Sequence, residues 1–374
     1  MARVLLAFEP PDGGVTENVL RLALGLGAHG HVVEAAGPRD AIVYPALSAA
    51  GIRVHRTAQS RSYRRPDREL LAVWQLGALV RRRRIDLVHC HTSKAGVTGR
   101  LAAWLTGVPA VYTPHCFPFI GELGAPRRVA ATAVERALAP LAAAIVCVAD
   151  WEREAALRRG IGPPGRLRVI HNGAPACDPG VAPAPALVAL RADGPLVAAI
   201  SVMRRQKTLE VFLDAVPRIL DAVREARCAL VGDGPEREAL RARARALGLD
   251  DHPRFAFLPF APPASKYLKA LDLYVLPSSW EALPIGALEA LACGVPQVAT
   301  AVGGTGEAVV PDTGILVPPH DPAALAAATA MLLRDPGRRA AMSRASVRRH
   351  AERFGVERMV AATARLYGEV LGRR

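Results

Sequence analysis

The chain alternates short, continuous apolar segments with longer segments of helical pattern, and it does so twice. In the N-terminal half, apolar segments at 4–8, 31–36, 86–89, 108–113 and 144–148 are interspersed with helical patterns at 16–28, 70–80 and 96–105. Short apolar runs separated by helices are typical of a parallel β-sheet covered by helices on both faces. The pattern therefore predicts an α/β fold.

A proline-rich interruption divides the chain. Residues 174–186 contain four prolines and have no regular period, which is typical of a linker. The alternation then restarts, with strands predicted at 196–201, 228–231, 254–257, 271–276 and 297–301 and helices at 209–222, 235–247, 283–292 and 322–333.

The length of 374 residues also favours two domains. We predict an N-terminal α/β domain at 1–178, a C-terminal one at 187–355, and a helical tail at 356–374 that returns to the first domain. Ligands of open parallel sheets bind at the carboxyl ends of the strands, so we expect the site in a cleft between two facing domains.

The charge is strongly basic, with a formal net charge of +14. Ten arginines lie between Arg53 and Arg84, against only Asp67 and Glu69. Two interpretations stay open: a solvated arginine-rich surface, or a surface that binds an anionic membrane. Nucleic acid is disfavoured as a partner, since few aromatic residues interleave the arginines and no nucleic-acid-binding signature is present.

The cysteine pattern predicts reduced thiols. The six cysteines are scattered, with no Cys-x-x-Cys pair, so we expect neither a zinc site nor a disulfide framework. The first apolar run, Val4 to Phe8, is too short for a secretory signal, and no run is long enough to span a membrane. We therefore predict a cytoplasmic protein, with peripheral attachment to the inner face of the membrane as the open alternative.

The segment from Ser278 to Glu307 contains most of the candidate ligand-binding residues. Glu281 follows a predicted strand, Pro284 lies in the first turn of the next helix, and Glu289 lies on that helix within an apolar run. Because a helix N-terminus presents unpaired N–H groups and a positive dipole end, it suits a diphosphate. Carboxylates at 281 and 289 could accept hydroxyl groups of a sugar and of a ribose. An unpaired acid among apolar residues would be costly, which favours a functional role for Glu289.

This segment resembles the donor-binding signature of retaining glycosyltransferases with two facing Rossmann-like domains. This group, of the GT-B fold and family 4 type, includes bacterial polysaccharide and phosphatidylinositol mannosyltransferases. Its two glutamates separated by seven residues, then Gly-x-Pro and Gly-Gly-x-x-Glu, correspond to Glu281, Glu289, Gly294-Val-Pro296 and Gly303-Gly-Thr-Gly-Glu307. Other motifs follow in the family's order: Gly232-Asp-Gly-Pro235, Phe257-Leu-Pro-Phe260, Leu271-Asp-Leu-Tyr-Val-Leu-Pro277 and Thr313-Gly-Ile-Leu-Val-Pro-Pro319.

The resemblance implies a role for each matching position. Glu281 would contact the donor sugar and Glu289 the ribose, while Glu307 would support the sugar-binding loop. The backbone near Leu258 would line the base. The backbone of the loop and helix start would cradle the sugar and diphosphate, through Pro284, Ile285 and Gly286.

The phosphate clamp departs from the family pattern. The family has an arginine five residues before a lysine, and here Lys207 is present but the arginine position holds Val202. Arg204 or Arg205 would then compensate.

In the N-terminal half, the resemblance implies two further contacts. Gly14, in Pro11-Asp-Gly-Gly14, matches the family's glycine pair, whose N–H groups approach the donor or acceptor. His115, in Tyr112-Thr-Pro-His115, matches a histidine that contacts the transferred sugar. His171-Asn-Gly173 resembles the family's Asn-Gly turn, but the aspartate that usually follows is absent.

The family implies transfer with retention, in which the leaving phosphate takes the acceptor's proton and no protein nucleophile acts. The catalytic set would be His115, Glu281 and Lys207. No Asp-x-Asp occurs in the chain, so neither a metal ion nor another cofactor is expected. The expected partners are a nucleotide sugar and a glycan, lipid-linked or small-molecule acceptor. The alternatives are a catalytically silent subunit that binds a nucleotide sugar, and a sugar-nucleotide 2-epimerase.

Overall fold

The protein consists of two compact α/β units. The computed structural model describes residues 1–59, 65–192 and 194–372. The first unit comprises Met1–Gly173 together with Val356–Arg374, and the second comprises Ala174–Gly355. The arginine-rich stretch is therefore described only in part, since Arg61 and Arg64 lie outside the described residues.

The first unit contains a seven-stranded sheet in the order β3-β2-β1-β4-β5-β6-β7, and every pairing in it is parallel. Its strands are β1 (Arg3–Phe8), β2 (Val32–Gly37), β3 (Arg53–Arg56), β4 (Leu87–His91), β5 (Ala110–Thr113), β6 (Ala144–Cys147) and β7 (Leu167–Val169). Alternate residues of β1 enter two different cores: Val4 and Leu6 pack in one, Leu5 and Ala7 in the other. The sheet is thus buried on both faces, as its continuous apolar strands predict.

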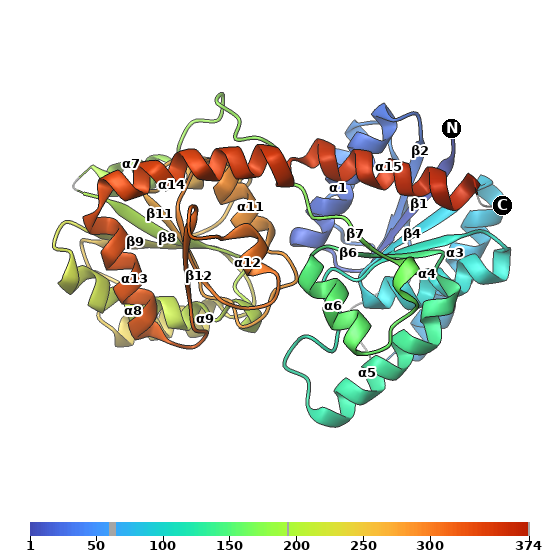
Figure 1. Ribbon diagram of the computed structural model, residues 1–374, viewed down its shortest axis with the longest axis horizontal. Coiled ribbons are helices and arrows are strands. Elements are labelled where there is room, and N and C mark those ends of the chain that lie inside the picture. Colours follow the sequence, from blue (N-terminus) through green and yellow to red (C-terminus); the bar gives the residue numbers. More distant parts are fainter. Residues whose placement is uncertain (60–64, 193, 373–374) are drawn as a thin grey trace. The chain divides into compact units, whose positions relative to one another are not determined.

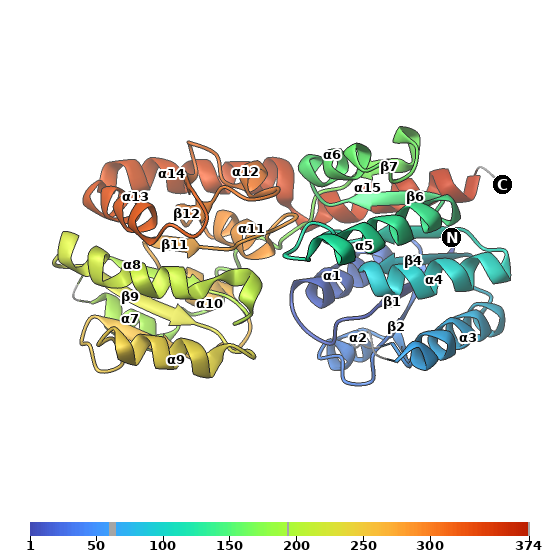
Figure 2. The same cartoon turned by 90° about the horizontal axis from the view of Figure 1, so that it is seen from below.

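Helices cover both faces of this sheet. They are α1 (Gly14–Ala28), α2 (Tyr44–Ala49), α3 (Pro66–Arg83), α4 (Ser93–Thr106), α5 (Ala125–Leu138), α6 (Asp150–Arg158) and α15 (Val356–Gly372). The last helix packs beside α1 (Figure 1), where the amide of Asn18 lies 3.2 Å from the sulfur of Met359. On the other face α3 and α4 run side by side (Figure 2).

The second unit contains a six-stranded parallel sheet in the order β10-β9-β8-β11-β12-β13. Its strands are β8 (Leu196–Ile200), β9 (Arg227–Val231), β10 (Phe255–Leu258), β11 (Leu273–Leu276), β12 (Gln297–Thr300) and β13 (Gly314–Val317). Its helices are α7 (Pro185–Arg191), α8 (Leu209–Ala222), α9 (Arg237–Ala246), α10 (Ser265–Leu268), α11 (Ile285–Ala292), α12 (Thr305–Ala308), α13 (Pro322–Arg334) and α14 (Pro336–Arg349). One core is formed by side chains of the sheet with α8, α9 and α13.

The prediction of two parallel-sheet α/β domains is confirmed, and the differences lie at the sheet edges. The sequence pattern did not predict β3 and β7, which are the two edge strands of the first sheet. The sequence of β3 is Arg-Val-His-Arg and that of β7 is Leu-Arg-Val, so neither forms a continuous apolar run. An edge strand has a neighbour on one side only, which leaves room for such polar residues.

The expectation that all cysteines are reduced is wrong for one pair. Cys177, in the proline-rich segment, is joined by a disulfide to Cys293, which caps the C-terminus of α11, with 4.9 Å between their Cα atoms. The partners are 116 residues apart in the sequence. Only the folded chain brings them together, so cysteine spacing could not indicate the bond. The other four cysteines are free.

No helix within the described part of the chain has the length and apolar character needed to cross a membrane.

A buried ion pair joins α4 to α5 in the first unit. The Arg100 guanidinium is completely buried, lies 3.0 Å from a carboxylate oxygen of Glu135, and stacks over the ring of Tyr112. The Tyr112 hydroxyl donates to the other carboxylate oxygen at 2.7 Å. Because both charges are shielded from water, each depends on the other for its stability.

We predict that Glu135→Leu destabilises the protein by about 3–5 kcal/mol, because it leaves the Arg100 charge buried without a counterion. The midpoint of chemical denaturation, followed by circular dichroism, measures this loss. Glu154→Ala, which removes the exposed pair of Glu154 with Arg158, is the matched control and should change stability by less than about 1 kcal/mol. Equal midpoints for the two variants would contradict the assigned role of the buried pair.

Candidate active site

The residues predicted to bind ligands fall in both units. Gly14 and His115 lie in the first unit, and the remaining ones lie in the second unit. In the second unit they gather where the chain leaves the carboxyl ends of β8, β10 and β11 and around the start of α11.

The loop between β11 and α11 holds the first glutamate. Glu281 is only 5 % exposed. The helix begins at Ile285, and Pro284 is its N-cap, two residues later than the pattern predicted. Pro284 has no N–H to lose and its fixed φ suits the residue that enters a helix. The first N–H groups of α11 therefore belong to Ile285 and Gly286, the positions predicted to cradle a diphosphate.

Glu281 forms an ion pair with Lys207. The ammonium of Lys207 lies 2.5 Å from Oε1 of Glu281, and Ser278 Oγ donates to the same oxygen at 2.8 Å. The second oxygen, Oε2, has a longer contact of 3.4 Å with the amide of Gln206. The two residues were predicted to bind different parts of a donor, and the structure shows that they also neutralise each other.

Hydrogen bonds to main-chain carbonyls hold Lys207 beside the loop of Glu281. Residues Arg205–Lys207 form one 3-10 turn, which ends at Thr208 with a left-handed φ of 38°. The Thr208 hydroxyl donates to the carbonyl of Pro277, and Ser279 N donates to the carbonyl of Gln206 at 2.9 Å. These bonds join two segments about 70 residues apart in the sequence, which is why the sequence alone could not reveal the pairing.

The two arginines proposed to replace the missing clamp lie at the start of this turn, with Arg204 as its N-cap and Arg205 as its first residue. Arg204 is half-buried and Arg205 is exposed, while Val202 is half-buried in the same segment. The segment is fixed in place because Met203 N donates to the carbonyl of Asp233 at 2.7 Å. Which arginine replaces the family's clamp stays a prediction.

Glycines allow the loops at the strand ends to approach closely. A Cβ on Gly232 would lie 2.1 Å from the carbonyl oxygen of Ser201, so any larger residue would separate the ends of β8 and β9. Gly232 N donates to the carbonyl of Leu258 at 3.0 Å. Leu258 thus has its carbonyl engaged inside the protein, which limits the backbone groups that it can offer to a base.

The second glutamate, Glu289, is half-buried on α11. Its near neighbour Tyr274 is fully buried on β11, and burial together with the charges of Glu281 and Glu289 raises the pKa of that phenol far above its usual value. A Cβ on Gly286 would lie 2.7 Å from the Tyr274 hydroxyl. Gly286 therefore lets α11 lie against the sheet at this point, and the phenol stays neutral between two carboxylates.

Gly303 packs directly against the first glutamate. Its φ is +53°, and a Cβ there would lie 1.7 Å from the carbonyl oxygen of Glu281. The neighbouring helix α12 carries Glu307, whose carbonyl accepts a hydrogen bond of 2.6 Å from Arg349. Within the Gly-Gly-x-x-Glu motif, therefore, Gly303 packs against the loop of Glu281, and the support of this loop by Glu307 stays a prediction.

In the first unit, Gly14 opens α1. Gly13 precedes it with a φ of 89°, and the Thr16 hydroxyl donates to the Gly13 carbonyl at 2.6 Å. The helix therefore begins directly after a turn that requires glycine. The Asn-Gly turn predicted near residue 172 has a structural role, since Asn18 of α1 donates to the side-chain oxygen of Asn172 at 3.0 Å.

His115 belongs to a cluster of three histidines at the ends of β4 and β5. His115 Nε2 lies 2.9 Å from His91 Nδ1, and the two rings stack. His89 is bonded on both nitrogens, to Tyr367 and to Thr113. Burial lowers the pKa of His89 and of His115 to about 3, and it lowers the pKa of His91 well below its usual value. All three rings are neutral near pH 7, so His115 can donate or accept a hydrogen bond but carries no charge.

The backbone at His115 is held in an uncommon conformation. His115 and Cys116 both have positive φ, of 53° and 103°. Glu152, at the start of α6, accepts the N–H of Cys116 and that of Val148, each at 2.8 Å. Such strained backbone persists only where surrounding contacts impose it, and it is concentrated at functional sites.

Two family models match the chain. A glycosyl transferase 4-like domain covers residues 13–173, and a glycosyl transferases group 1 domain covers 194–335. A D-inositol 3-phosphate glycosyltransferase of Thermobispora bispora is 32 % identical over 315 residues, which are 78 % of this chain and 72 % of that protein. The chain belongs to this family of glycosyltransferases.

Solved structures agree with this assignment at the level of the fold. Sucrose-phosphate synthase from Thermosynechococcus elongatus matches with a TM-score of 0.87 and 23 % identity, covering all of both chains. Anabaena HepE in complex with UDP-glucose matches with a TM-score of 0.83 and 21 % identity, covering 99 % of this chain and 100 % of that one. The fold of this glycosyltransferase is therefore GT-B.

Several residues around Glu281 and around His115 were not predicted from the sequence. Ser278 and Gln206 contact the Glu281 carboxylate, and His91 contacts His115. Ser278 lay inside the segment already singled out, but only its hydroxyl contact gives it significance. His91 gains significance only from its contact with His115, which follows the neighbouring strand.

We predict that Gly303→Ala reduces the kcat/KM of this glycosyltransferase about a hundredfold, because the new methyl group must displace the backbone of Glu281. Steady-state kinetics with the donor varied measures the loss. Gly306→Ala is the matched control, since a Cβ at that position meets only a side-chain carbon of Leu316 at 3.6 Å. If Gly303→Ala retained the activity of Gly306→Ala, Gly303 would have no part in placing the glutamate.

Proposed function

We propose that the protein is a retaining glycosyltransferase that moves a sugar from a nucleotide diphosphate donor to a glycan, lipid-linked or small-molecule acceptor. The observation that carries this proposal is the ion pair of Lys207 with Glu281, placed beside the N-terminus of α11. It puts a cation, a carboxylate and unpaired N–H groups within one small region, which is the chemistry that a sugar diphosphate requires.

The diphosphate is assigned to Lys207 and to the first N–H groups of α11. Lys207 has three N–H donors, and the Glu281 carboxylate takes one of them. The remaining donors can bind phosphate oxygens while the ion pair persists. Positive charge at this point stabilises the nucleoside diphosphate as it leaves, which lowers the barrier to breaking the bond to the sugar.

The sugar and the ribose are assigned to the two glutamates. Oε1 of Glu281 is occupied by Lys207 and Ser278, so Oε2 is the oxygen offered to a sugar hydroxyl. Glu289 lies on α11, eight residues after Glu281, and accepts the ribose hydroxyls. Glu307 supports the loop without touching the donor.

His115 is assigned to the transferred sugar. Its Nε2 is engaged by His91, so Nδ1 is the nitrogen left to bond a sugar hydroxyl. Because the ring is neutral, it contributes to positioning and not to charge. In the retaining reaction the departing phosphate takes the acceptor's proton on the face where it leaves, so the chain supplies no nucleophile. We propose no metal ion, because the sequence contains no Asp-x-Asp motif.

The donor nucleotide is proposed to be UDP, because the structural neighbour HepE was solved with UDP-glucose. We also place the protein in the cytoplasm, with peripheral attachment to an anionic membrane. Helix α3 supports that attachment, since it exposes Leu70 and Trp74 and ends in Arg81, Arg82 and Arg83. Sedimentation with anionic vesicles at low salt tests this attachment, and absence of binding would contradict it.

A catalytically silent, nucleotide-sugar-binding subunit is the second candidate. Val202, where the family has a clamp arginine, is the observation that favours it. Turnover of a donor would exclude it.

We predict that the purified protein slowly releases nucleotide from one member of a panel of nucleotide sugars, and that UDP sugars give the signal. Lys207→Ala should reduce this release at least about a hundredfold, since it removes the phosphate cation and leaves Glu281 buried and unpaired. Glu289→Ala should weaken donor binding. His115→Ala should lower turnover while leaving the affinity for free UDP unchanged, because its proposed contact is to the sugar.

The Lys266→Ala variant, whose half-buried side chain is assigned no contact with the donor, is the control and should match the wild type. Binding of a nucleotide sugar without turnover, with or without acceptors, would favour the silent subunit. Equal activity of Lys207→Ala and the wild type would contradict the proposed site.

A further inference from the structure

Two consecutive residues after β5 depend on outside contacts for their backbone conformation. His115 and Cys116 have φ of 53° and 103°, and neither is glycine. A positive φ crowds the Cβ of an L-residue against its own backbone, so the conformation persists only where surrounding groups impose it. The groups that hold this part of the chain therefore also set the place of the His115 side chain.

Helix α6 supplies such contacts at both of its ends. At its start, Oε1 of Glu152 accepts the N–H of Cys116 at 2.8 Å. At its end, the guanidinium carbon of Arg159 lies 4.5 Å from the centre of the Phe119 ring. Between these points Phe117 is fully buried and stacks on Phe119, with 5.0 Å between the ring centroids. The segment after β5 is thus attached to α6 at two points.

Main-chain N–H groups engage both oxygens of the Glu152 carboxylate. Oε1 accepts from Cys116 and Oε2 accepts from Val148, each at 2.8 Å. The side chain is fully buried, and no cation forms an ion pair with it in the part of the chain that the structure describes. Burial raises the pKa of Glu152 to about 7, although the main-chain hydrogen bonds oppose this shift. A buried acid without a counterion is costly, which calls for a role that explains its presence.

The start of the helix explains only one of the two bonds. A glutamate in the first turn commonly accepts an N–H from the residues just before the helix, as Glu152 does from Val148. The bond to Cys116 is of another kind, because Cys116 lies 36 residues away and follows a different strand. This second bond joins α6 to the residue next to His115.

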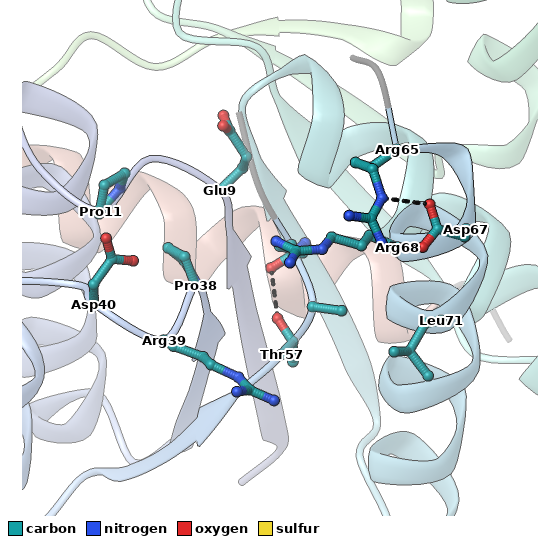
Figure 3. A pocket seen from close by; sticks show the side chains of 12 residues that line it. Glu9, Pro11, Pro38, Arg39, Asp40, Thr57, Arg65, Asp67, Arg68 and Leu71 are labelled. Atoms are coloured by element: carbon teal, nitrogen blue, oxygen red, sulfur yellow. Dashed lines mark hydrogen bonds and ion pairs between the residues drawn. The ribbon is translucent and has the colours of Figure 1, made fainter. Parts of the chain in front are cut away.

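Glu152 is closed off from ligands, unlike other acidic residues of this unit. Glu9 and Asp40 line a cavity of about 560 Å³, formed by the segments that follow β1, β2 and β3 and by the start of α3 (Figure 3). Glu152 does not line this cavity, and its side chain has no exposed surface. Its carboxylate therefore affects a reaction only through the groups that it holds.

We propose that Glu152 is a positioning residue, whose bond to the Cys116 N–H holds the ring of His115 where it can bond a hydroxyl of the transferred sugar. The histidine is then fixed from two sides. His91 bonds its Nε2 at 2.9 Å, and Glu152 holds the main chain beside it. This inference rests on the proposed glycosyl transfer and adds to it a residue that never touches the donor.

Glu152→Gln tests the role directly, because the amide keeps the size of the side chain but accepts hydrogen bonds at its oxygen only. Its NH2 group would face the N–H of either Cys116 or Val148. We predict a kcat for nucleotide release about tenfold below that of the wild type, with KM for the donor changed by less than about twofold. Glu154→Gln, which alters an exposed glutamate of the same helix, is the matched control and should match the wild type.

Combination with His115→Ala separates positioning from a general effect on the fold. Because Glu152 acts through His115, Glu152→Gln should lower kcat by no more than about twofold when residue 115 is already alanine. An equal, tenfold loss in both backgrounds would show that Glu152 acts elsewhere and would overturn the proposal.

A second substitution tests the same bond from its other end. Glycine adopts a positive φ without strain, so Cys116→Gly should recover at least about threefold of the kcat lost in Glu152→Gln. Cys116→Ala keeps the Cβ and should recover none of it. Equal recovery by the two substitutions, or recovery by neither, would contradict the claim that Glu152 holds this backbone.

Nuclear magnetic resonance of the histidine rings distinguishes failure of this inference from failure of the proposed function. The ring signals of His115, identified by their loss in His115→Ala, should shift in Glu152→Gln and stay in place in Glu154→Gln. A protein that releases nucleotide, but in which Glu152→Gln changes neither these signals nor kcat, retains the function and loses the inference. A protein that shows the shift but turns over no donor retains the positioning of His115 and loses the function.

Discussion

The ion pair between Lys207 and Glu281 is the interaction on which the candidate donor site depends. A carboxylate that is 5 % exposed is costly without a counterion, and Lys207 supplies it at 2.5 Å. The hydrogen bonds donated by the Thr208 hydroxyl and by the Ser279 N–H hold the two loops in this arrangement, and Gly303 leaves room for it. Before any ligand arrives, therefore, a buried negative charge already positions the cation that a diphosphate needs. Little reorganisation remains for the reaction, which is the basis of electrostatic catalysis.

The first unit differs from the second in that the histidine side chains at its candidate site are neutral. His89 and His91 are buried, His115 is half-buried, and all three rings are uncharged; the hydrogen bond with His91 holds the ring of His115 in place. Its cavity is lined by charged side chains and by Thr57, whose hydroxyl donates to the carbonyl of Gly37 (Figure 3). The parallel sheet connects these features, because the carboxyl ends of its strands all lie at one edge. One edge thus presents a neutral hydrogen-bonding group and a cavity lined by side chains of both charges.

The sequence predicted what periodicity and local motifs encode. Apolar runs such as Val4–Phe8 predicted the buried strands, and the spacing of Glu281 and Glu289 predicted the segment that holds the candidate donor site. It could not predict contacts between residues far apart in the chain, such as the ion pair to Lys207 or the disulfide of Cys177 with Cys293. The edge strand β3 was missed because Arg53 and Arg56 interrupt its apolar pattern. Arg39 and Arg68 were not distinguished from other arginines, because only the fold places them at one cavity.

Amide hydrogen exchange of the intact protein, with and without saturating UDP, tests the central claim most directly. The account predicts slower exchange in the turn at 203–208 and at the start of α11, residues 285–288, because those segments hold the diphosphate. Exchange at the buried strands should not change. Protection confined to the first unit, or no protection at these two segments under saturating UDP, would contradict the placement of the donor in the second unit.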